Sequence, residues 1–299
     1  MPIDIAIIPV AGYGTRLLPA TKSQPKEMLP VARKPAVQYI VEELAMSGIR
    51  RVLFVTGSGK TAIENHFDVD NDLISYLRNT KREGLLSALE FERQDMEYFY
   101  TRQRQQLGLG DAVLCARPLL GAENVVVALG DSIIRSPHES NVLDRMMHLF
   151  EEKDADLVIA FQEVAEKDVV KYGVAQPKKG EDTGEFFKLE DVVEKPSIED
   201  APSRLAISAR YIFKPKIFEA LANLQPGKGQ EVQLTDAIRQ VIKEGGKSYG
   251  VRLAPGERRI DVGNFGSYFQ AFVDFALEDE EYGPELKRYL KTRLESGGI

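Results

Sequence analysis

The segment best suited to chemistry is a glycine-rich turn near the start of the chain. The apolar run Ile3–Val10 is followed at positions 11–16 by AGYGTR. A turn of this kind, at the carboxyl end of a first parallel strand, is where open α/β sheets bind ligands that carry phosphate. Gly12 and Gly14 let backbone N–H groups approach phosphate oxygens, and the planar guanidinium of Arg16 can donate to two oxygens at once. The pattern predicts a phosphate-binding loop.

A second cation follows in the same loop. Lys26 lies in a segment bracketed by Pro25 and Pro30, and the two prolines restrict the chain so that the lysine side chain can be aimed. A lone lysine in a loop is usually a solvated surface charge. Because two cations flank one glycine-rich turn, we interpret Arg16 and Lys26 as ligands of a nucleotide's phosphates.

Spacing excludes two common phosphate motifs. The dinucleotide fingerprint requires Gly or Ala three residues after the second glycine, where this chain has Leu17. A P-loop requires a glycine five residues before Gly59 of the Gly-Lys-Thr triplet at 59–61, where this chain has Phe54. We therefore interpret the segment GSGK at 57–60 as a turn between a strand and a helix.

Composition narrows the class of protein. The chain has 299 residues, 43% of them hydrophobic, a size that suits one large α/β domain or two small ones. Its net charge of −7 argues against nucleic acid or an anionic membrane as a partner. The single cysteine, Cys115, excludes an internal disulfide and a zinc site of several thiolates. Because apolar runs are too short to cross a bilayer and Asp4 interrupts any signal core, we expect a cytoplasmic protein.

The N-terminal half alternates strand and helix patterns that would position the loop. Strands are predicted at Ile3–Val10, Arg51–Thr56, Ser87–Arg93, Val125–Leu129 and Leu157–Gln162. Helices are predicted at Ala36–Ser47, around Ala62–Phe67 and from Asp111 to Ala116. This rhythm implies right-handed crossovers. It predicts a Rossmann-like, doubly wound α/β fold whose sheet is mixed but mostly parallel, with helices on both faces.

Past residue 165 the alternation loosens. Shorter strands are predicted at Tyr172–Gln176, Lys188–Glu194 and Ile207–Phe213. Helices are predicted at Lys216–Leu224, Gln233–Glu244, Phe265–Leu277 and Pro284–Glu295. We expect one α/β domain over 1–277, with a nucleotide-binding part at about 1–165 and a smaller lobe at about 166–264. A C-terminal helical extension would cover 278–299.

The motifs along the chain resemble one known family. The segment 11–30 follows the pattern GxGTRxLPxTKxxPKEMLP. Further matches follow in the family's order at Gln38-Tyr39 with Glu42-Glu43, Arg102-Gln103, 107–110 (LGLG), 129–131 (LGD), 172–174 (YGV), 193–196 (VEKP), Arg210-Tyr211, 231–238 (EVQLTDAI) and Asp261 with Gly263-Asn264. Together they resemble the bacterial-type UTP–glucose-1-phosphate uridylyltransferases (UDP-glucose pyrophosphorylases) and, more loosely, the wider sugar-nucleotide pyrophosphorylases. The resemblance covers almost the whole chain.

The resemblance implies a nucleotidyl transfer. Glucose 1-phosphate would attack the α-phosphorus of UTP in line, giving UDP-glucose and pyrophosphate, a step that needs positioning and charge neutralisation. Arg16 and Lys26 would be the catalytic residues, and Asp131 and Asp261 would hold Mg²⁺. Independently, a carboxylate after a central strand suits a hard cation. The structural alternatives are a cap for Asp131 and ordinary turn chemistry before Gly263 for Asp261.

Further roles are carried over by position from the resemblance. Backbone groups and one amide would read the uracil, which offers both acceptors and an N–H donor. The residues implied for the nucleotide are Ala11, Gly12, Gly14, Thr15, Glu27, Gln103, Gly108 and Asp131. Those implied for the sugar phosphate are Gly173, Glu194, which would accept from glucose hydroxyls, and Lys195, which would contact a phosphate. Without the motif, the segment 190–194 would be interpreted as a solvated edge strand.

One position departs from the family pattern. Asp111 stands where the typical pattern has His, and it would either cap the helix that begins there or alter base or sugar preference. Two alternatives therefore stay open: a pyrophosphorylase for another nucleotide or sugar 1-phosphate, such as dTTP, and a noncatalytic paralogue that binds nucleotide sugar and regulates a partner. Retention of both cations and both aspartates disfavours the second. The resemblance also implies a homodimer or homotetramer, with the C-terminal helices available for contact.

Overall fold

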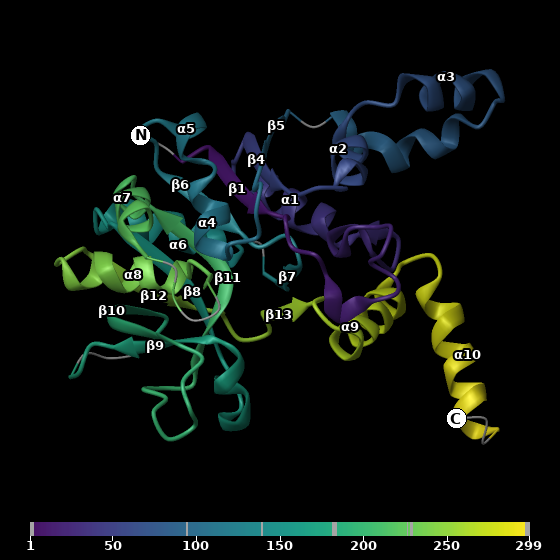
Figure 1. The fold of residues 1–299 in the computed structure, drawn as a ribbon. Coiled ribbons are helices and arrows are strands. Elements are labelled where there is room, and N and C mark those ends of the chain that lie inside the picture. Colours follow the sequence, from purple (N-terminus) through teal and green to yellow (C-terminus); the bar gives the residue numbers. More distant parts are fainter. Residues whose placement is uncertain are drawn as a thin grey trace.

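A nine-stranded sheet runs through the part of the chain that the computed structural model describes, residues 3–93, 95–138, 140–180, 184–225, 227 and 230–296. The strands, in their order across the sheet, are β5 (Glu97–Arg102), β4 (Arg51–Thr56), β1 (Ile5–Pro9), β6 (Val125–Ala128), β11 (Leu205–Phe213), β8 (Leu157–Glu163), β12 (Ser248–Arg252), β10 (Phe186–Glu194) and β9 (Gly173–Pro177). The order interleaves distant segments, so β1 lies between β4 and β6 and places the first loop near the centre of the sheet (Figure 1).

The sheet is mixed, with most strands pointing the same way. β1 is parallel to β4 and β6, and β4 is parallel to β5. β11 is antiparallel to both neighbours, β6 and β8. β12 is parallel to β8, and β10 is antiparallel to β12 and β9. Only β11 and β10 among these described strands therefore run opposite to the others, which confirms the predicted mixed, mostly parallel α/β sheet.

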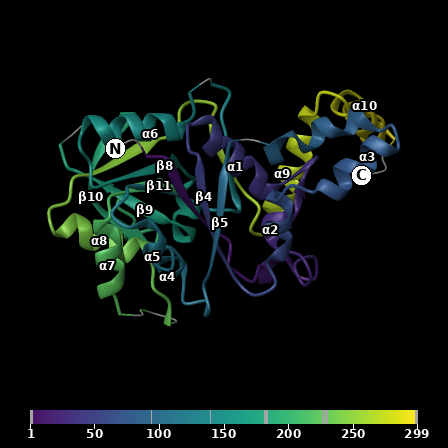
Figure 2. The same ribbon diagram turned by 90° about the horizontal axis from the view of Figure 1, so that it is seen from above.

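Helices cover both faces because the central strands are apolar on both. In β1, Ile5 and Ile7 pack into one core cluster and Ala6 and Ile8 into the other, as alternation along a strand requires. Figure 2 shows α1 (Ala36–Met46) and α6 (Val142–Glu152) along one side of the sheet, and α4 (Leu109–Leu114), α7 (Lys216–Asn223) and α8 (Leu234–Lys243) along the other. The short helix α5 (Arg117–Leu120) follows α4, and its Leu120 joins the second cluster.

Several short elements lie beside the main sheet. The strands β7 (Ser132–Arg135) and β13 (Arg258–Asp261) pair antiparallel. β2 (Pro30–Val31) and β3 (Lys34–Pro35) form a small hairpin. The 3-10 turns η1 (Thr15–Leu17) and η2 (Lys26–Met28) shape the first loop, and η4 (Glu166–Lys171) precedes β9.

A buried ion pair fixes β7 against α1. Arg210, in β11, is 0% exposed and donates through two nitrogens to Glu43 in α1, at 2.9 and 2.7 Å. The same guanidinium donates to the carbonyl of Ser132 at 3.1 Å. A buried charge without its partner is strongly destabilising. This pair therefore holds the start of β7, directly after Asp131, in one place.

Three helical segments after β4 project from the sheet, and one of them occupies a segment that was predicted to be a strand. α2 (Thr61–Phe67), α3 (Asn71–Asn79) and η3 (Glu83–Arg93) extend away from the sheet, at the upper right of Figure 1. The prediction of a strand at Ser87–Arg93 is wrong, because this segment belongs to η3. There the Phe91 ring stacks on the His66 ring, with 4.7 Å between the ring centres. The strand is β5, whose run EYFYTR is richer in β-forming aromatic residues.

The last two helices lie beside the hairpin and away from the main sheet. α9 (Phe265–Glu278) packs against β2 and β13, and α10 (Gly283–Glu295) contacts α9 near the C-terminus (Figure 1). None of the helices in the described ranges is long and apolar enough to span a membrane. The domain division at about 165 and 277 stays a prediction, and 297–299 of the expected extension lie outside the described residues.

Candidate active site

The candidate site forms at the carboxyl ends of four neighbouring parallel strands. Gln103 follows β5, Lys60 stands four residues after β4, Gly12 stands three residues after β1, and Asp131 stands three residues after β6. In open α/β sheets this edge is where ligands bind. Strand order thus brings together residues that are far apart in the sequence.

The glycine-rich turn folds back on the segment that carries Lys26. Gly14 has a φ of 67°, a left-handed conformation that suits glycine. Its carbonyl accepts a hydrogen bond from the Thr21 hydroxyl at 2.8 Å. A Cβ placed on Gly12 would lie 4.0 Å from the Lys26 ammonium nitrogen. The turn therefore places backbone amides beside a cation, as a phosphate site requires.

A cavity of about 490 Å³ lies against this turn. The predicted residues that line it are Ala11, Gly12, Gly14, Thr15, Arg16, Lys26, Glu27, Gln103, Gly108 and Asp131. We call it the nucleotide-side cavity. All the residues that sequence analysis assigned to the nucleotide therefore face one space.

Lys26 and Asp131 form the central ion pair of the site. The Lys26 ammonium donates to Asp131 Oδ2 at 2.5 Å. Burial alone would lower the pKa of Lys26, but the carboxylates of Asp131, Glu27 and Asp261 outweigh it and raise that pKa. Burial alone would raise the pKa of Asp131, but the charge and hydrogen bond of Lys26 lower it. Both groups are therefore charged at neutral pH.

Asp131 and Asp261 stand on neighbouring chain segments. The backbone N–H of Val262 donates to the Asp131 carbonyl at 3.0 Å, and Asp261 pairs with Ser132 across β13 and β7. The described residues contain no cluster of three or more His, Cys, Asp or Glu side chains able to hold a metal. Mg²⁺ is commonly held by one or two carboxylates together with substrate phosphates and water. The donor set of two carboxylates fits that ion.

Arg16 links the two halves of the site. A Cβ placed on Gly263 would lie 2.6 Å from Asp261 Oδ1 and 2.9 Å from Arg16 Nη2, so a side chain there would displace this carboxylate and this guanidinium. Arg16 lines the nucleotide-side cavity and also a larger neighbouring one. It therefore stands where the two cavities meet.

The larger cavity, of about 960 Å³, opens on the other side of Arg16 and Asp131. We call it the sugar-side cavity. The predicted residues that line it are Arg16, Asp131, Gly173, Glu194, Lys195 and Asp261. Leu109, Leu129 and Gln233, like Arg16 and Asp131, line both cavities. Every site residue predicted from the sequence thus lines one of two adjoining cavities.

The sugar-side cavity offers both acceptors and cations. Glu194 Oε2 accepts from the Thr235 hydroxyl at 3.1 Å, and Lys195 Nζ lies 3.5 Å from the other Glu194 oxygen. A Cβ on Gly173 would lie 2.7 Å from Ile207 Cδ1 and 3.2 Å from Glu194 Oε2, so a larger residue there would push these side chains aside. The arrangement can accept from sugar hydroxyls and neutralise a phosphate.

Sequence analysis missed Arg259, which lines the sugar-side cavity. Its guanidinium carbon lies 4.4 Å from the centre of the Tyr172 ring, and Nη1 donates to the Ile207 carbonyl at 2.8 Å. Arg259 and Asp261 are two residues apart in β13, so the alternation of a strand places both on one face. The spacing of two residues between Arg259 and Asp261 was the sequence signal that could have identified Arg259.

Glu27 reaches the nucleotide-side cavity but is already engaged. It is 1% exposed and accepts from Lys60 Nζ at 3.0 Å. Burial raises the pKa of Glu27, and the charges of Lys60 and Lys26 oppose that rise. The turn at 57–60 is a strand-to-helix turn, as predicted, and its lysine serves a buried carboxylate.

Asp111 does not cap the helix that it was expected to begin. α4 starts at Leu109 with Gly108 as its N-cap residue, and no side chain caps it. Asp111 lies in the first turn, and its Oδ2 accepts from Gln103 Nε2 at 2.7 Å. The carboxylate does not itself line the nucleotide-side cavity but contacts Gln103, which does.

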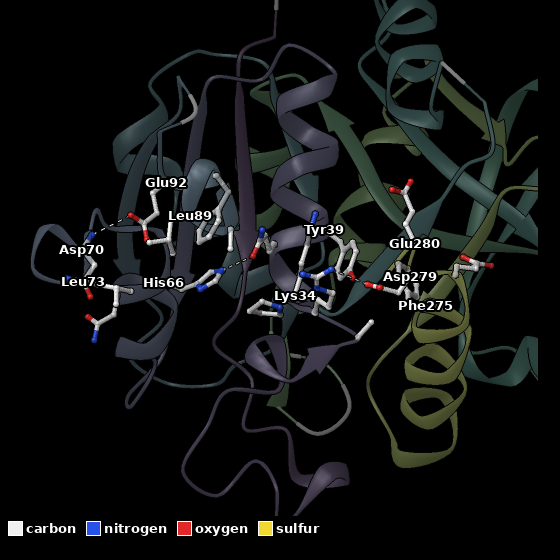
Figure 3. Close-up of a pocket in the computed structure, with 18 of the residues that line it drawn as sticks. Lys34, Tyr39, His66, Asp70, Leu73, Leu89, Glu92, Phe275, Asp279 and Glu280 are labelled. Carbon is white, nitrogen blue, oxygen red and sulfur yellow. Dashed lines mark hydrogen bonds and ion pairs between the residues drawn. The ribbon is translucent and has the colours of Figure 1, made fainter. Parts of the chain in front are cut away.

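Another cavity, of about 910 Å³, lies away from these residues (Figure 3). It is bounded by α1, α2, η3 and the end of α9, and His66 Nε2 there lies 3.0 Å from Gln38 Oε1. The cations on its wall are engaged with carboxylates: Lys34 with Glu42, Arg33 with Glu281 and Arg135 with Glu278. None of the predicted site residues lines it. It is a poorer candidate for binding phosphate.

Comparison with known proteins agrees with this geometry. The sequence model of the family described as nucleotidyl transferase matches residues 5–278. A UTP–glucose-1-phosphate uridylyltransferase of Staphylococcus epidermidis is 41% identical over 290 residues, which are 97% of this chain and 98% of that protein.

Two solved structures are also similar. A UTP-bound UGPase from Acinetobacter baumannii superposes with a TM-score of 0.87 at 34% identity, covering 96% of this chain and 98% of that one. A UDP-glucose pyrophosphorylase complexed with UDP-glucose superposes with a TM-score of 0.81 at 37% identity, covering 91% of this chain and 98% of that one. Since the family match spans nearly the whole chain and the relatives align along nearly their full length, this protein belongs to the nucleotidyl transferase family.

Proposed function

We propose that this protein is a UTP–glucose-1-phosphate uridylyltransferase, which converts UTP and glucose 1-phosphate to UDP-glucose and pyrophosphate. The observation that carries the proposal is the shared wall of the two cavities, where Arg16 and Asp131 face both spaces. A nucleotide on one side and a sugar phosphate on the other would meet there. The names of the relatives, and the UTP-bound and UDP-glucose-complexed neighbours, support uridine and glucose as the two halves.

On the nucleotide side, the turn supplies positive charge and amide donors. Arg16, Lys26 and the amides near Gly12 and Gly14 would bind the triphosphate and stabilise the charge that grows on it as pyrophosphate leaves. Thr15, Gly108 and Ala11 would complete the nucleotide wall, with Gln103 facing the base. Lys26 is positioned for this by its ion pair with Asp131.

On the sugar side, Glu194 would accept from glucose hydroxyls and Lys195 would bind the phosphate of glucose 1-phosphate. The neighbouring Gly173 leaves room for the sugar ring next to β9. Because the two cavities adjoin, a phosphate oxygen of the sugar can approach the α-phosphorus of the nucleotide opposite the leaving pyrophosphate. Holding both reactants in line supplies much of the rate enhancement in such transfers.

Asp131 and Asp261 would hold Mg²⁺ between them and the substrate phosphates. When bound, the ion would neutralise phosphate charge and polarise the reacting phosphoryl group. Two cations of the chain lie beside these carboxylates. Lys26 keeps Asp131 ionised, and Arg16 lies beside Asp261 across Gly263.

The test of the proposal is to measure pyrophosphate release with a panel of substrates. Each of UTP, dTTP, CTP, ATP and GTP is paired with glucose, galactose or mannose 1-phosphate. We expect UTP with glucose 1-phosphate to be the best pair, and to require Mg²⁺. Lys26→Ala should lower kcat about 10²–10³-fold, because it removes a cation that stabilises developing charge. A best pair with another base or sugar would assign a different pyrophosphorylase. Tight UDP-glucose binding without turnover of any pair would assign the regulatory role.

We also propose that the protein is a homodimer or homotetramer assembled through α9, and that it works in the cytoplasm, where nucleoside triphosphates are made. In the 14-residue helix α9, only Ala271 is buried among the described residues. Phe269, Phe272 and Val273 are 59%, 38% and 44% exposed. Contiguous exposed apolar side chains on one helix are typical of a protein interface.

A further inference from the structure

Both hydrogens of the Gln103 side-chain amide are used inside the protein. Gln103 is 5% exposed and follows β5, where its backbone N–H donates to the Thr56 carbonyl at 2.9 Å. Its Nε2 donates to Asp111 Oδ2 at 2.7 Å and to the Gly108 carbonyl at 3.0 Å. Because an amide nitrogen has two hydrogens, these contacts saturate it.

The other end of the same amide is left for a ligand. Within the described ranges, no group of the protein donates a hydrogen bond to Gln103 Oε1. This oxygen is also not one of the fully buried side-chain atoms without a partner, so it is accessible. Gln103 lines the nucleotide-side cavity together with Gly12 and Gly14. The group that Gln103 offers to the cavity is therefore an acceptor.

Two acceptors, the Asp111 carboxylate and the Gly108 carbonyl, select which end of the amide faces the cavity, and Asp111 is the one that a substitution can remove. The nitrogen and oxygen ends of glutamine have nearly the same shape, so neighbouring groups select the orientation. A carboxylate can only accept, and the flipped amide would set Oε1 against it, oxygen to oxygen. A histidine, with ring nitrogens that donate or accept according to the tautomer, would impose no such choice.

We propose that Asp111 is a positioning residue that sets the base preference of the nucleotide-side cavity. By holding Gln103 Nε2, it keeps Oε1 turned toward a base whose ring nitrogen carries a hydrogen. The N3 of uracil carries one, whereas the N3 of cytosine is an acceptor and would face Oε1 lone pair to lone pair. This inference rests on the proposed function, because it assumes that the base lies against Gln103.

The test compares the dissociation constants of UTP and CTP, measured by calorimetry without any sugar 1-phosphate. The intact protein should bind UTP more tightly than CTP. Asp111→Ala should reduce that ratio severalfold, because only the neutral Gly108 carbonyl then holds Gln103 Nε2. Asp111→Asn has both a donor end and an acceptor end and can adapt to either orientation of the Gln103 amide, so its ratio should lie between those of the intact protein and Asp111→Ala. In a Gln103→Ala background, Asp111→Ala should have no further effect on it.

Asp72→Ala serves as the matched control. Asp72 is another first-turn carboxylate, in α3, and it is remote from both cavities, so its loss should leave the ratio unchanged. The proposal is overturned if Asp111→Ala keeps the ratio of the intact protein, if it weakens UTP and CTP by the same factor, or if the intact protein does not distinguish them. Failure of the proposed function would appear elsewhere, as no pyrophosphate release from UTP and glucose 1-phosphate.

Discussion

Three buried or half-buried ion pairs fix the elements around the site, and two of them connect its loops to the sheet. Lys26 with Asp131 joins the first loop to the end of β6, and Lys60 with Glu27 joins the end of β4 to the first loop. Arg210 with Glu43 joins β11 to α1. A buried pair costs desolvation that its attraction only partly repays, so its clearest effect is to fix geometry. Each pair here fixes a segment that bears a site residue.

The pair of Lys60 and Glu27 makes a prediction about stability. Lys60→Met should lower the free energy of unfolding by about 3 kcal/mol at neutral pH, because it leaves a carboxylate buried and unpaired. Denaturation with urea measures the change. The double variant Lys60→Met with Glu27→Gln should recover part of it, because neither position of the pair then carries a charge.

The stability lost in the Lys60→Met variant should depend on pH in a defined direction. Burial already raises the pKa of Glu27 above its ordinary 4.5, and loss of Lys60 should raise it further. A carboxyl with a raised pKa contributes its full stability below 4.5 and loses it as the pH rises through the folded value. Relative to the intact protein, Lys60→Met should therefore be more destabilised at pH 8 than at pH 5. Equal losses at both would contradict a buried ionised Glu27.

Residue types and spacing pointed to the glycine turn, Arg16, Lys26 and Asp131, and the family resemblance supplied the other candidate residues, but few of their partners could be predicted. The glycine turn, Arg16 and Lys26 are adjacent in sequence, so their common role could be inferred. The pairing of Lys60 with Glu27 could not, because it depends on β4 lying next to β1 in the sheet. Arg259 was missed for the same reason, since β13 is placed only by pairing with β7.

At the scale of elements, apolar strands with two covered faces were the best predicted. The strand at Arg51–Thr56 and the helix starting at Ala36 match the structure at those bounds. The alternation in Ser87–Arg93 is the period of a strand, yet it packs as η3, because Phe91 gains contacts with His66 and Phe67 there. α6 went unpredicted, although Asn141 and Asp144 form a capping box at its start.

The exposed aromatic face of α9 makes a prediction about assembly. Phe269→Ser with Phe272→Ser should convert an oligomer to the 33.4 kDa monomer, as measured by light scattering, with little change in melting temperature. Tyr76→Ser is the matched control, since Tyr76 is an aromatic residue on α3 with 53% exposure. An intact protein that is already monomeric, or a double variant that keeps the full mass, would contradict assembly through α9.

At the scale of the whole molecule, the lining of the two cavities is less acidic than the chain, whose net charge is −7. Arg16, Lys26, Lys195 and Arg259 all line the two adjoining cavities. Local charge in a cleft, and not the total, governs the attraction of a charged substrate. The fold thus places these cations where the central strands end, beside the carboxylates that line the same cavities, Glu27, Asp131, Glu194, Glu231 and Asp261.

The adjoining cavities also determine how the reaction must run. If both substrates are bound at once across Arg16 and Asp131, the sugar phosphate attacks the nucleotide directly. A single in-line displacement inverts the configuration at phosphorus, whereas two successive displacements through a nucleotidylated side chain restore it.

The most direct test is therefore the stereochemistry of the product formed from UTP with one sulfur at a defined position on the α-phosphorus, with glucose 1-phosphate and Mg²⁺. Phosphorus NMR of the thio-substituted UDP-glucose reports the configuration. The account predicts inversion, with no labelled protein. Retention of configuration, or uridylylated protein isolated in the absence of sugar phosphate, would contradict it.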